Sequence, residues 1–163
     1  MEMNEPRALH VTEGEEGKNL WVADELMAFK ASGKDTGGAY ALTDSVVPPG
    51  GGPPPHLHYR EEEAFWVLEG ELELTAGGTT FGARSGSFIH LPKGVPHAYR
   101  NVGAGPASFL TLIVPAELEG FFEEVGKPGS DLSSPPPFGE EDIEKLLAVA
   151  PKYGVEVLPP HEQ

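Results

Sequence analysis

The sequence predicts an all-β domain, a β-sandwich or barrel, with short helices near its C-terminal end. Short apolar runs recur through the middle of the chain, and turns rich in glycine and proline separate them. The 163 residues include 21 glycines and 17 prolines without a collagen repeat, an excess that many turns between short strands would produce. After Pro115 the apolar residues change to helical spacing.

The chain begins with a polar segment, and residues 1–19 are interpreted as an N-terminal arm or loop. Residues 20–114 follow as a strand-rich domain. Its predicted strands are residues 20–22, 26–31, 39–47, 64–68, 71–75, 79–82, 87–91, 97–102 and 107–114. Between the third and fourth strands, the prolines and glycines of residues 48–55 exclude a helix or a central strand and predict an extended segment.

The C-terminal part, residues 115–163, is interpreted as a helical extension. Residues 116–125 predict a short helix with Pro115 at its start, whose apolar face would close the barrel or contact a second copy. Residues 140–150 predict a second amphipathic helix, and the last residues are interpreted as a tail. No internal repeat is visible, which favours one barrel over a tandem of two.

Composition excludes several classes of function. The length suits one domain with one core. The net charge of −15 argues against nucleic acid and anionic membranes as partners, because both would be repelled. The absence of cysteine excludes disulfides and thiolate metal sites. No secretory signal and no apolar run of about 18 residues are visible, so we expect a cytoplasmic protein without a membrane partner.

Four residues form a candidate metal site: His56, His58, Glu63 and His97. The first two are separated by one residue, and residues i and i+2 of a strand point to the same face. A single histidine in a strand is more often a core or surface residue, but this combination is improbable by chance. Three imidazoles and a carboxylate suit one divalent transition metal, such as Fe, Ni, Mn, Cu or Zn. An octahedral ion would keep two positions for water, dioxygen or a substrate oxygen.

Two segments resemble the conserved motifs of the cupin family. The first motif is matched by Gly50, His56, His58, Glu63 and Gly70, and the second by Gly86, Pro92, Gly94, His97 and Asn101. The resemblance implies a double-stranded β-helix, or jelly-roll barrel, over residues 20–114, with the metal inside it. It also implies that the four candidate residues are the metal ligands. The segments 53–70 and 115–126 look like those of single-domain, quercetinase-like cupins.

The resemblance to quercetin 2,3-dioxygenase-type cupins implies a metal-dependent dioxygenase that cleaves a flavonol-like or other enolic aromatic substrate. Glu63 would be both a metal ligand and the general base that accepts the substrate's hydroxyl proton. Phe65, Tyr99 and Tyr40 are candidate substrate-binding residues, because the first two share strand parity with metal ligands. By the same parity Trp66 should face outward.

Other interpretations stay open at this point. The barrel could bind a metal and a small molecule without turnover. A sugar isomerase or epimerase fits less well, because the candidate pocket is apolar and aromatic. Phe29, Phe88 and Phe109 are expected in the barrel core. The resemblance also implies a homodimer, with the helix around Phe121 and Phe122 and the arm before Leu20 as candidate contacts.

Overall fold

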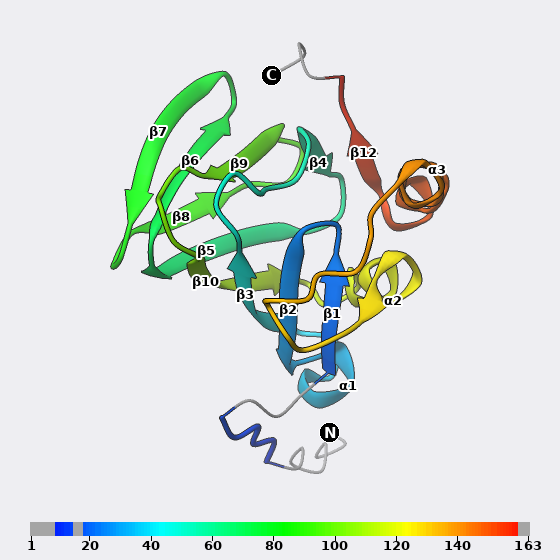
Figure 1. The fold of residues 1–163 in the computed structure, drawn as a ribbon. Helices are drawn as coiled ribbons and strands as arrows, with labels where there is room; N and C mark the ends of the chain where they lie inside the picture. Colours follow the sequence, from blue (N-terminus) through cyan, green and yellow to red (C-terminus); the bar gives the residue numbers. More distant parts are fainter. Residues whose placement is uncertain (1–8, 15–17, 160–163) are drawn as a thin grey trace, which may run out of the picture.

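Two antiparallel β-sheets face each other in the computed structural model, which describes residues 9–14 and 18–159 (Figure 1). One sheet contains, in spatial order, β11 (Lys127–Pro128), β1 (Lys18–Val22), β2 (Glu25–Ala31), β3 (Ala41–Val47), β10 (Ala107–Val114), β5 (Glu62–Glu69) and β8 (Phe88–Leu91). The other contains β12 (Val155–Val157), β4 (His56–His58), β9 (His97–Asn101), β6 (Glu71–Ala76) and β7 (Thr79–Arg84). This architecture confirms the predicted jelly-roll barrel.

The strands bury one face and expose the other. In β2 and β3 every second residue is buried, which is the period that a pleated strand imposes. Phe29 and Phe109 are buried as predicted, and Trp66 is 49% exposed on the outer face. The prediction for Phe88 is wrong, because it pairs with Trp66 on the outer face and is 62% exposed.

The segment that leads into the candidate site is held by backbone contacts. Gly50 and Gly51 exchange hydrogen bonds of 2.9 Å with Asn101 on β9. Gly52 has a φ of 149°, and a Cβ at this position would lie 1.9 Å from the carbonyl oxygen of Tyr99. Only glycine tolerates this approach. The extended residues 53–55 are thereby delivered to β4, the strand that carries His56 and His58.

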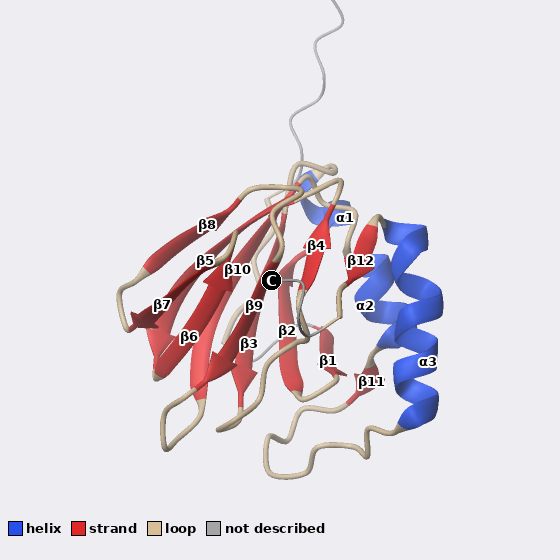
Figure 2. Ribbon diagram, turned by 90° about the horizontal axis from the view of Figure 1, so that it is seen from above, coloured by secondary structure: helices blue, strands red, loops and turns tan. Residues whose placement is uncertain are grey.

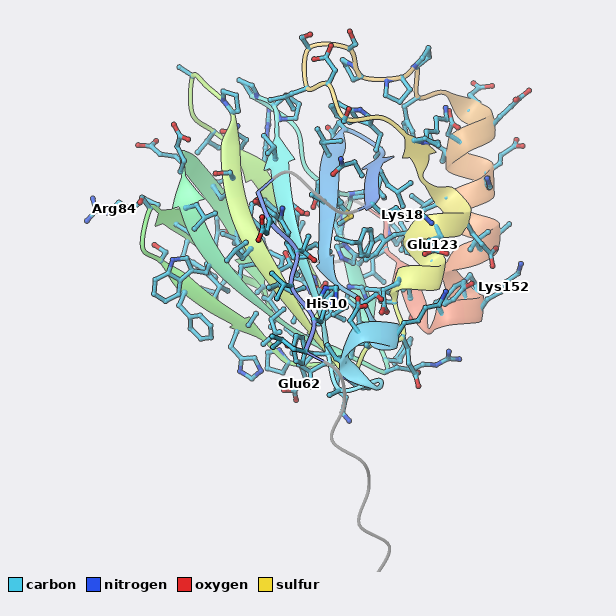
Figure 3. The ribbon with its side chains drawn as sticks, turned by 90° about the horizontal axis from the view of Figure 1, so that it is seen from below. His10, Lys18, Glu62, Arg84, Glu123 and Lys152 are labelled. Carbon is cyan, nitrogen blue, oxygen red and sulfur yellow. The ribbon has the colours of Figure 1, made fainter. Side chains whose placement is uncertain are left out.

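Helices cover one side of the barrel, next to β12, β11 and β1 (Figure 2). They are α2 (Glu119–Val125) and α3 (Glu140–Val149), and a 3₁₀ turn at Ala150–Tyr153 follows α3. A further short helix, α1 (Gly33–Thr36), lies between β2 and β3. An ion pair of 3.2 Å between Lys18 and Glu123 links β1 to α2 at the surface (Figure 3). The apolar face of α2 closes the barrel, because Phe121 and Phe122 are buried inside the chain.

Some predictions about the chain ends are corrected. The predicted tail contains β12, which pairs with β4 in a register that places Val155 opposite His58. The unpredicted β11 pairs with β1. Within the predicted arm, residues 18–19 belong to β1, while residues 1–8 and 15–17, like 160–163 of the extension, lie outside the described residues. No helix in the described ranges is long and apolar enough to cross a bilayer, and the cytoplasmic location stays a prediction.

Candidate metal centre

The structure brings together all four of the predicted metal-ligand side chains. His56 and His58 lie on β4, and His56 is directly opposite His97 of β9 in the ladder. Glu63 projects from β5 in the other sheet, on the same buried face as Phe65. One ligand atom from each side chain lies within 4.8 Å of the others, and all are buried except the half-buried His56. The cluster therefore bridges the two sheets inside the barrel.

Backbone carbonyls orient two of the imidazoles. His56 Nδ1 lies 2.8 Å from the carbonyl oxygen of Pro54, and His97 Nδ1 lies 3.0 Å from that of Val95. A carbonyl oxygen only accepts hydrogen bonds, so Nδ1 carries the proton in each ring. Nε2 then keeps its lone pair, which is the state that metal-binding histidines need.

Glu63 supplies negative charge to the cluster. Its Oε2 lies 3.3 Å from His58 Nε2 and 3.2 Å from His97 Nε2. Burial would raise the pKa of Glu63, but the neighbouring imidazoles of His58 and His97 outweigh it and hold that pKa well below 4.5. Glu63 is therefore ionised at neutral pH, so the cluster contains an anionic ligand.

The histidines respond differently to their surroundings. Burial lowers the pKa of His56 to about 3, and its histidine neighbours add to this effect. Burial also acts to lower the pKa of His58, but Glu63 outweighs it and raises that pKa above 6.5. His58 Nε2 and His97 Nε2 are buried, and no hydrogen bond from the described residues satisfies them. A divalent cation would satisfy these nitrogens, so the donor set fits a transition metal with nitrogen and oxygen ligands.

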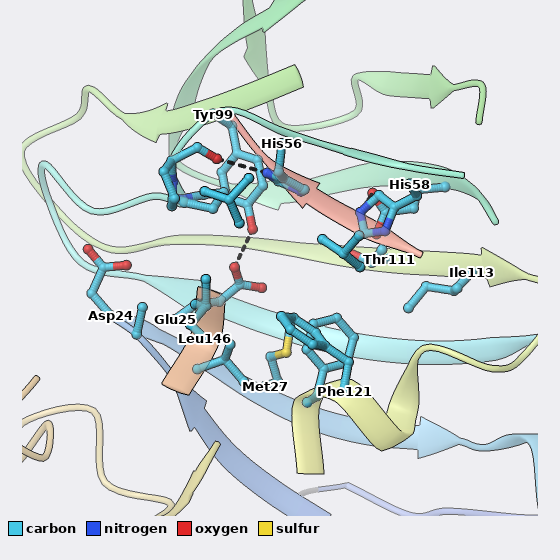
Figure 4. Close-up of a pocket in the computed structure, with 18 of the residues that line it drawn as sticks. Asp24, Glu25, Met27, His56, His58, Tyr99, Thr111, Ile113, Phe121 and Leu146 are labelled. Atoms are coloured by element: carbon cyan, nitrogen blue, oxygen red, sulfur yellow. Dashed lines mark hydrogen bonds and ion pairs between the residues drawn. The ribbon is translucent and has the colours of Figure 1, made fainter. Parts of the chain in front are cut away.

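A cavity of about 90 Å³ adjoins the cluster. Its wall includes Phe65 and Tyr99, two of the predicted substrate-binding residues, and Met27, Phe121 and Leu146 from the opposite side. Figure 4 shows the histidines of β4 on one side of this space and Met27 and Phe121 on the other. The lining is mostly apolar, so it favours a ligand with an apolar or aromatic surface.

Tyr40 does not line this cavity, contrary to the substrate-binding role predicted for it. Its side chain is 40% exposed. It precedes β3, and its backbone N–H and C=O both bond to the hydroxyl of Thr36 at the end of α1. These bonds hold Tyr40 in the surface turn outside the barrel.

Sequence reasoning missed two buried carboxyl groups near the cluster. Glu25 lies at the start of β2 and lines the cavity. It shares strand parity with the buried Met27 and Phe29, a signal that could have marked it as inward-facing. Glu61 is 1% exposed, and neither of its oxygens has a hydrogen-bond partner in the part of the chain that the structure describes. Burial raises the pKa of Glu61, although the nearby charge of His58 lowers it.

Residues 44–113 match the cupin domain family, and this range carries the whole candidate cluster. The chain contains a cupin domain. Over 119 residues, 73% of this chain, it is 30% identical to a quercetin 2,3-dioxygenase of Bacillus subtilis, and the match spans 35% of that relative. The chain therefore spans about a third of the length of this curated relative.

Two solved cupin structures have the same fold. A predicted oxalate decarboxylase from Thermotoga maritima aligns with a TM-score of 0.60 and 22% identity, over 64% of this chain and 98% of that one. An RmlC-like cupin from Shewanella frigidimarina aligns with a TM-score of 0.61 and 16% identity, over 70% of this chain and 97% of that one. At such identities the likeness concerns the fold alone.

Proposed function

We propose that this cupin is a metal-dependent oxidoreductase of the dioxygenase type, which cleaves a flavonol-like or other enolic substrate with O₂. The observation that carries the proposal is the cluster of three histidines and Glu63 beside an apolar cavity. The similarity to a quercetin 2,3-dioxygenase supports it. A mostly apolar wall suits an aromatic ring better than the hydroxyl-rich substrate of a sugar isomerase.

The side chains of the site would have three separate roles: metal binding, proton acceptance and exclusion of water. His56, His58, Glu63 and His97 would hold one divalent metal, which supplies a Lewis acid for the substrate's hydroxyl oxygen and for O₂. Glu63 accepts the hydroxyl proton, because its carboxylate is ionised at neutral pH. Phe65 and Phe121 line the cavity and exclude water from the substrate.

The size of the cavity favours a compact substrate. Its volume of about 90 Å³ is below the roughly 300–1,000 Å³ typical of sites that enclose drug-sized ligands. A small enolic ring would fit with little rearrangement. A complete flavonol would require Leu146 of α3 and its neighbours to move outward.

The test is oxygen uptake by protein loaded separately with each of the five candidate metals. The substrates are quercetin and maltol, a 3-hydroxy-4-pyranone that carries only the enolic ring of a flavonol. We expect metal-dependent uptake, with carbon monoxide release if the ring opens as in a flavonol. His97→Ala should abolish uptake. His90→Ala is the matched control, because His90 is exposed and lies 3.0 Å from Glu62 outside the cluster.

Two results would contradict this proposal. Binding of both compounds without oxygen uptake for any metal would indicate a non-catalytic metal- and ligand-binding cupin. Uptake that survives in His97→Ala with no bound metal would remove the cluster from the reaction.

We also propose a homodimer formed through the outer face of β5, β8 and β10. Trp66 lies between Phe88 and Leu110 across this face. The outward positions 64, 66 and 68 of β5 and 108, 110, 112 and 114 of β10 carry no charge. Glu62, an outward carboxylate at the start of β5, pairs with His90 of β8 at 3.0 Å. Two copies of a chain with a net charge of −15 can therefore meet over the uncharged positions. The helix around Phe121 is unsuited to this contact, because its apolar side chains are already buried.

A further inference from the structure

Glu61 lies in the short connection between the two strands that carry most of the cluster. β4 ends at His58 in one sheet, and β5 begins at Glu62 in the other. Glu61 shares its inward parity with the buried Glu63, because Glu62 between them is exposed. It is not a member of the four-residue cluster. Its side chain therefore enters the barrel beside two candidate ligands without being one itself.

The carboxyl group of Glu61 is buried without a hydrogen bond. Neither oxygen has a partner among the described residues, and an unpaired buried polar group opposes folding. Two hydrogen-bond donors are among its electrostatic neighbours, His58 and Arg60. The guanidinium of Arg60 donates instead to the carbonyl oxygen of Lys152, at 3.1 Å. His58 is therefore the donor that this carboxyl group can recruit.

His58 lacks an acceptor in the same place. Its Nε2 points at the cluster, 3.3 Å from Oε2 of Glu63. A histidine that binds a metal through Nε2 carries its proton on Nδ1, and this proton needs an acceptor when the ring is buried. Backbone carbonyls meet this need for the other two histidines. Nδ1 of His58 is buried and has no partner among the described residues.

We propose that Glu61 is a positioning residue of the metal centre, whose carboxyl oxygen accepts a hydrogen bond from Nδ1 of His58. The two side chains are close enough for the charge of each to act on the pKa of the other. The structure shows them as neighbours that are not yet bonded, so rotation of one side chain completes the bond. The inference rests on the metal site of the proposed function but not on the reaction proposed there.

The bond would select the form of His58 that binds a metal. An imidazole in its other neutral tautomer carries the proton on Nε2 and has no lone pair for an ion. An acceptor at Nδ1 disfavours that tautomer, fixes the orientation of the ring and makes Nε2 a stronger donor to the metal. A carboxyl group has an accepting oxygen whether or not it is ionised, so this role does not depend on the charge of Glu61.

The first experiment measures zinc affinity by competition with a chromophoric chelator. Glu61→Leu removes the acceptor and should weaken zinc binding about 10- to 100-fold, the loss typical when the partner of a metal-binding histidine is removed. Glu61→Gln keeps an accepting oxygen and should restore most of the affinity. Glu62→Leu is the matched control, because it removes the adjacent, exposed carboxylate and should bind zinc as the wild type does.

The second experiment observes the bond itself by NMR of zinc-loaded protein with ¹⁵N-labelled histidine. In the wild type the Nδ1 proton of His58 should be visible and slow to exchange with water. In Glu61→Leu this signal should shift or disappear. The Nδ1 protons of His56 and His97 are internal controls, because they bond to the carbonyls of Pro54 and Val95, and their signals should not change.

Urea unfolding of the zinc-free protein separates positioning from support of the fold. Since Glu61 has no bond to lose among the described residues, Glu61→Leu should unfold at a higher urea concentration than the wild type. A variant that binds zinc less tightly but resists unfolding better is the expected combination. A lower unfolding midpoint together with weaker zinc binding would show that Glu61 only supports the fold, and would overturn the proposal.

The remaining outcomes are decisive as well. Unchanged zinc affinity in Glu61→Leu would overturn the role of Glu61. If that variant does not fold, the wild-type spectrum decides, and a His58 ring with its proton on Nε2, or an Nδ1 proton in rapid exchange with water, would refute the bond. Both results leave the dioxygenase proposal intact. A wild-type protein that binds no zinc and none of the other candidate metals would refute the metal centre and both proposals together.

Discussion

The buried carboxyl of Glu25 should make the stability of the folded chain depend on pH. Burial raises its pKa from 4.5 to about 7. Between these values the folded protein keeps a proton that the unfolded chain has lost, so the free energy of unfolding falls as pH rises. The contribution is fully present below pH 4.5 and lost above about pH 7. At about 1.4 kcal/mol per pH unit, it amounts to about 3 kcal/mol.

Glu25→Gln isolates this contribution. The amide keeps the size of the side chain and an acceptor for the hydrogen bond that the Tyr99 hydroxyl donates to Glu25, but it does not ionise. In metal-free protein the variant should match the wild type near pH 4.5 and exceed its free energy of unfolding by about 3 kcal/mol above about pH 8. Urea unfolding followed by tryptophan fluorescence gives both values.

The control and the refuting result are equally direct. Glu62→Gln replaces an exposed carboxylate on β5 in the same sheet and is the control for the removal of a carboxylate at the surface. If Glu25→Gln changed the free energy of unfolding by the same amount at every pH, the carboxyl would not titrate differently in the folded and unfolded states. The reasoning from burial would then fail.

Three further predictions concern the cluster, the outer sheet and the approach to β4. His97→Ala should abolish stoichiometric metal binding, because it removes one of the four candidate ligands; metal analysis checks this. Trp66→Glu should convert the proposed dimer to a monomer in light scattering, because two buried carboxylates would face each other. Gly52→Ala should destabilise the fold by more than about 3 kcal/mol in thermal unfolding, because its Cβ would lie 1.9 Å from the Tyr99 carbonyl oxygen.

Each of these changes has a matched control. His90→Ala, which removes an exposed histidine outside the cluster, should keep its full metal content. Full metal content in His97→Ala would show that His97 is not a ligand. Glu73 lies on β6 in the other sheet, so Glu73→Gln should leave the oligomeric state unchanged. If the wild type is a monomer at all concentrations, the proposed dimer does not exist. Gly78 has a φ of 81° and open space around it. If Gly78→Ala costs as much as Gly52→Ala, backbone strain and not the Tyr99 contact explains the loss.

The sequence predicted the barrel strands and the candidate cluster because short-range rules determine both. Glycine and proline mark the turns, and His56 and His58 share a face since they are two residues apart. Strand parity also predicted the inward direction of Phe65 and the outward direction of Trp66. These features need only the period of a strand.

Features that depend on pairing between distant segments were not predictable in this way. The inward direction of Glu25 follows only once the core face of β2 is known, and an acidic residue at a strand start is usually solvated. Tyr40 was assigned to the pocket from its residue type, but the bonds of its backbone to Thr36 hold it in a surface turn. β12 has only three residues, too few for a periodic pattern, and its partner β4 is almost a hundred positions earlier.

The pairing of β12 with β4 also bears on the order in which the protein is assembled during synthesis. The strand that carries His56 and His58 has one edge paired with β9, and its other edge stays open until residues 155–157 have left the ribosome. An open strand edge can pair with another chain. In any state in which residues 155–157 are not yet paired, the strand that carries His56 and His58 therefore has an open edge, and pairing with β12 protects that edge from association with another chain.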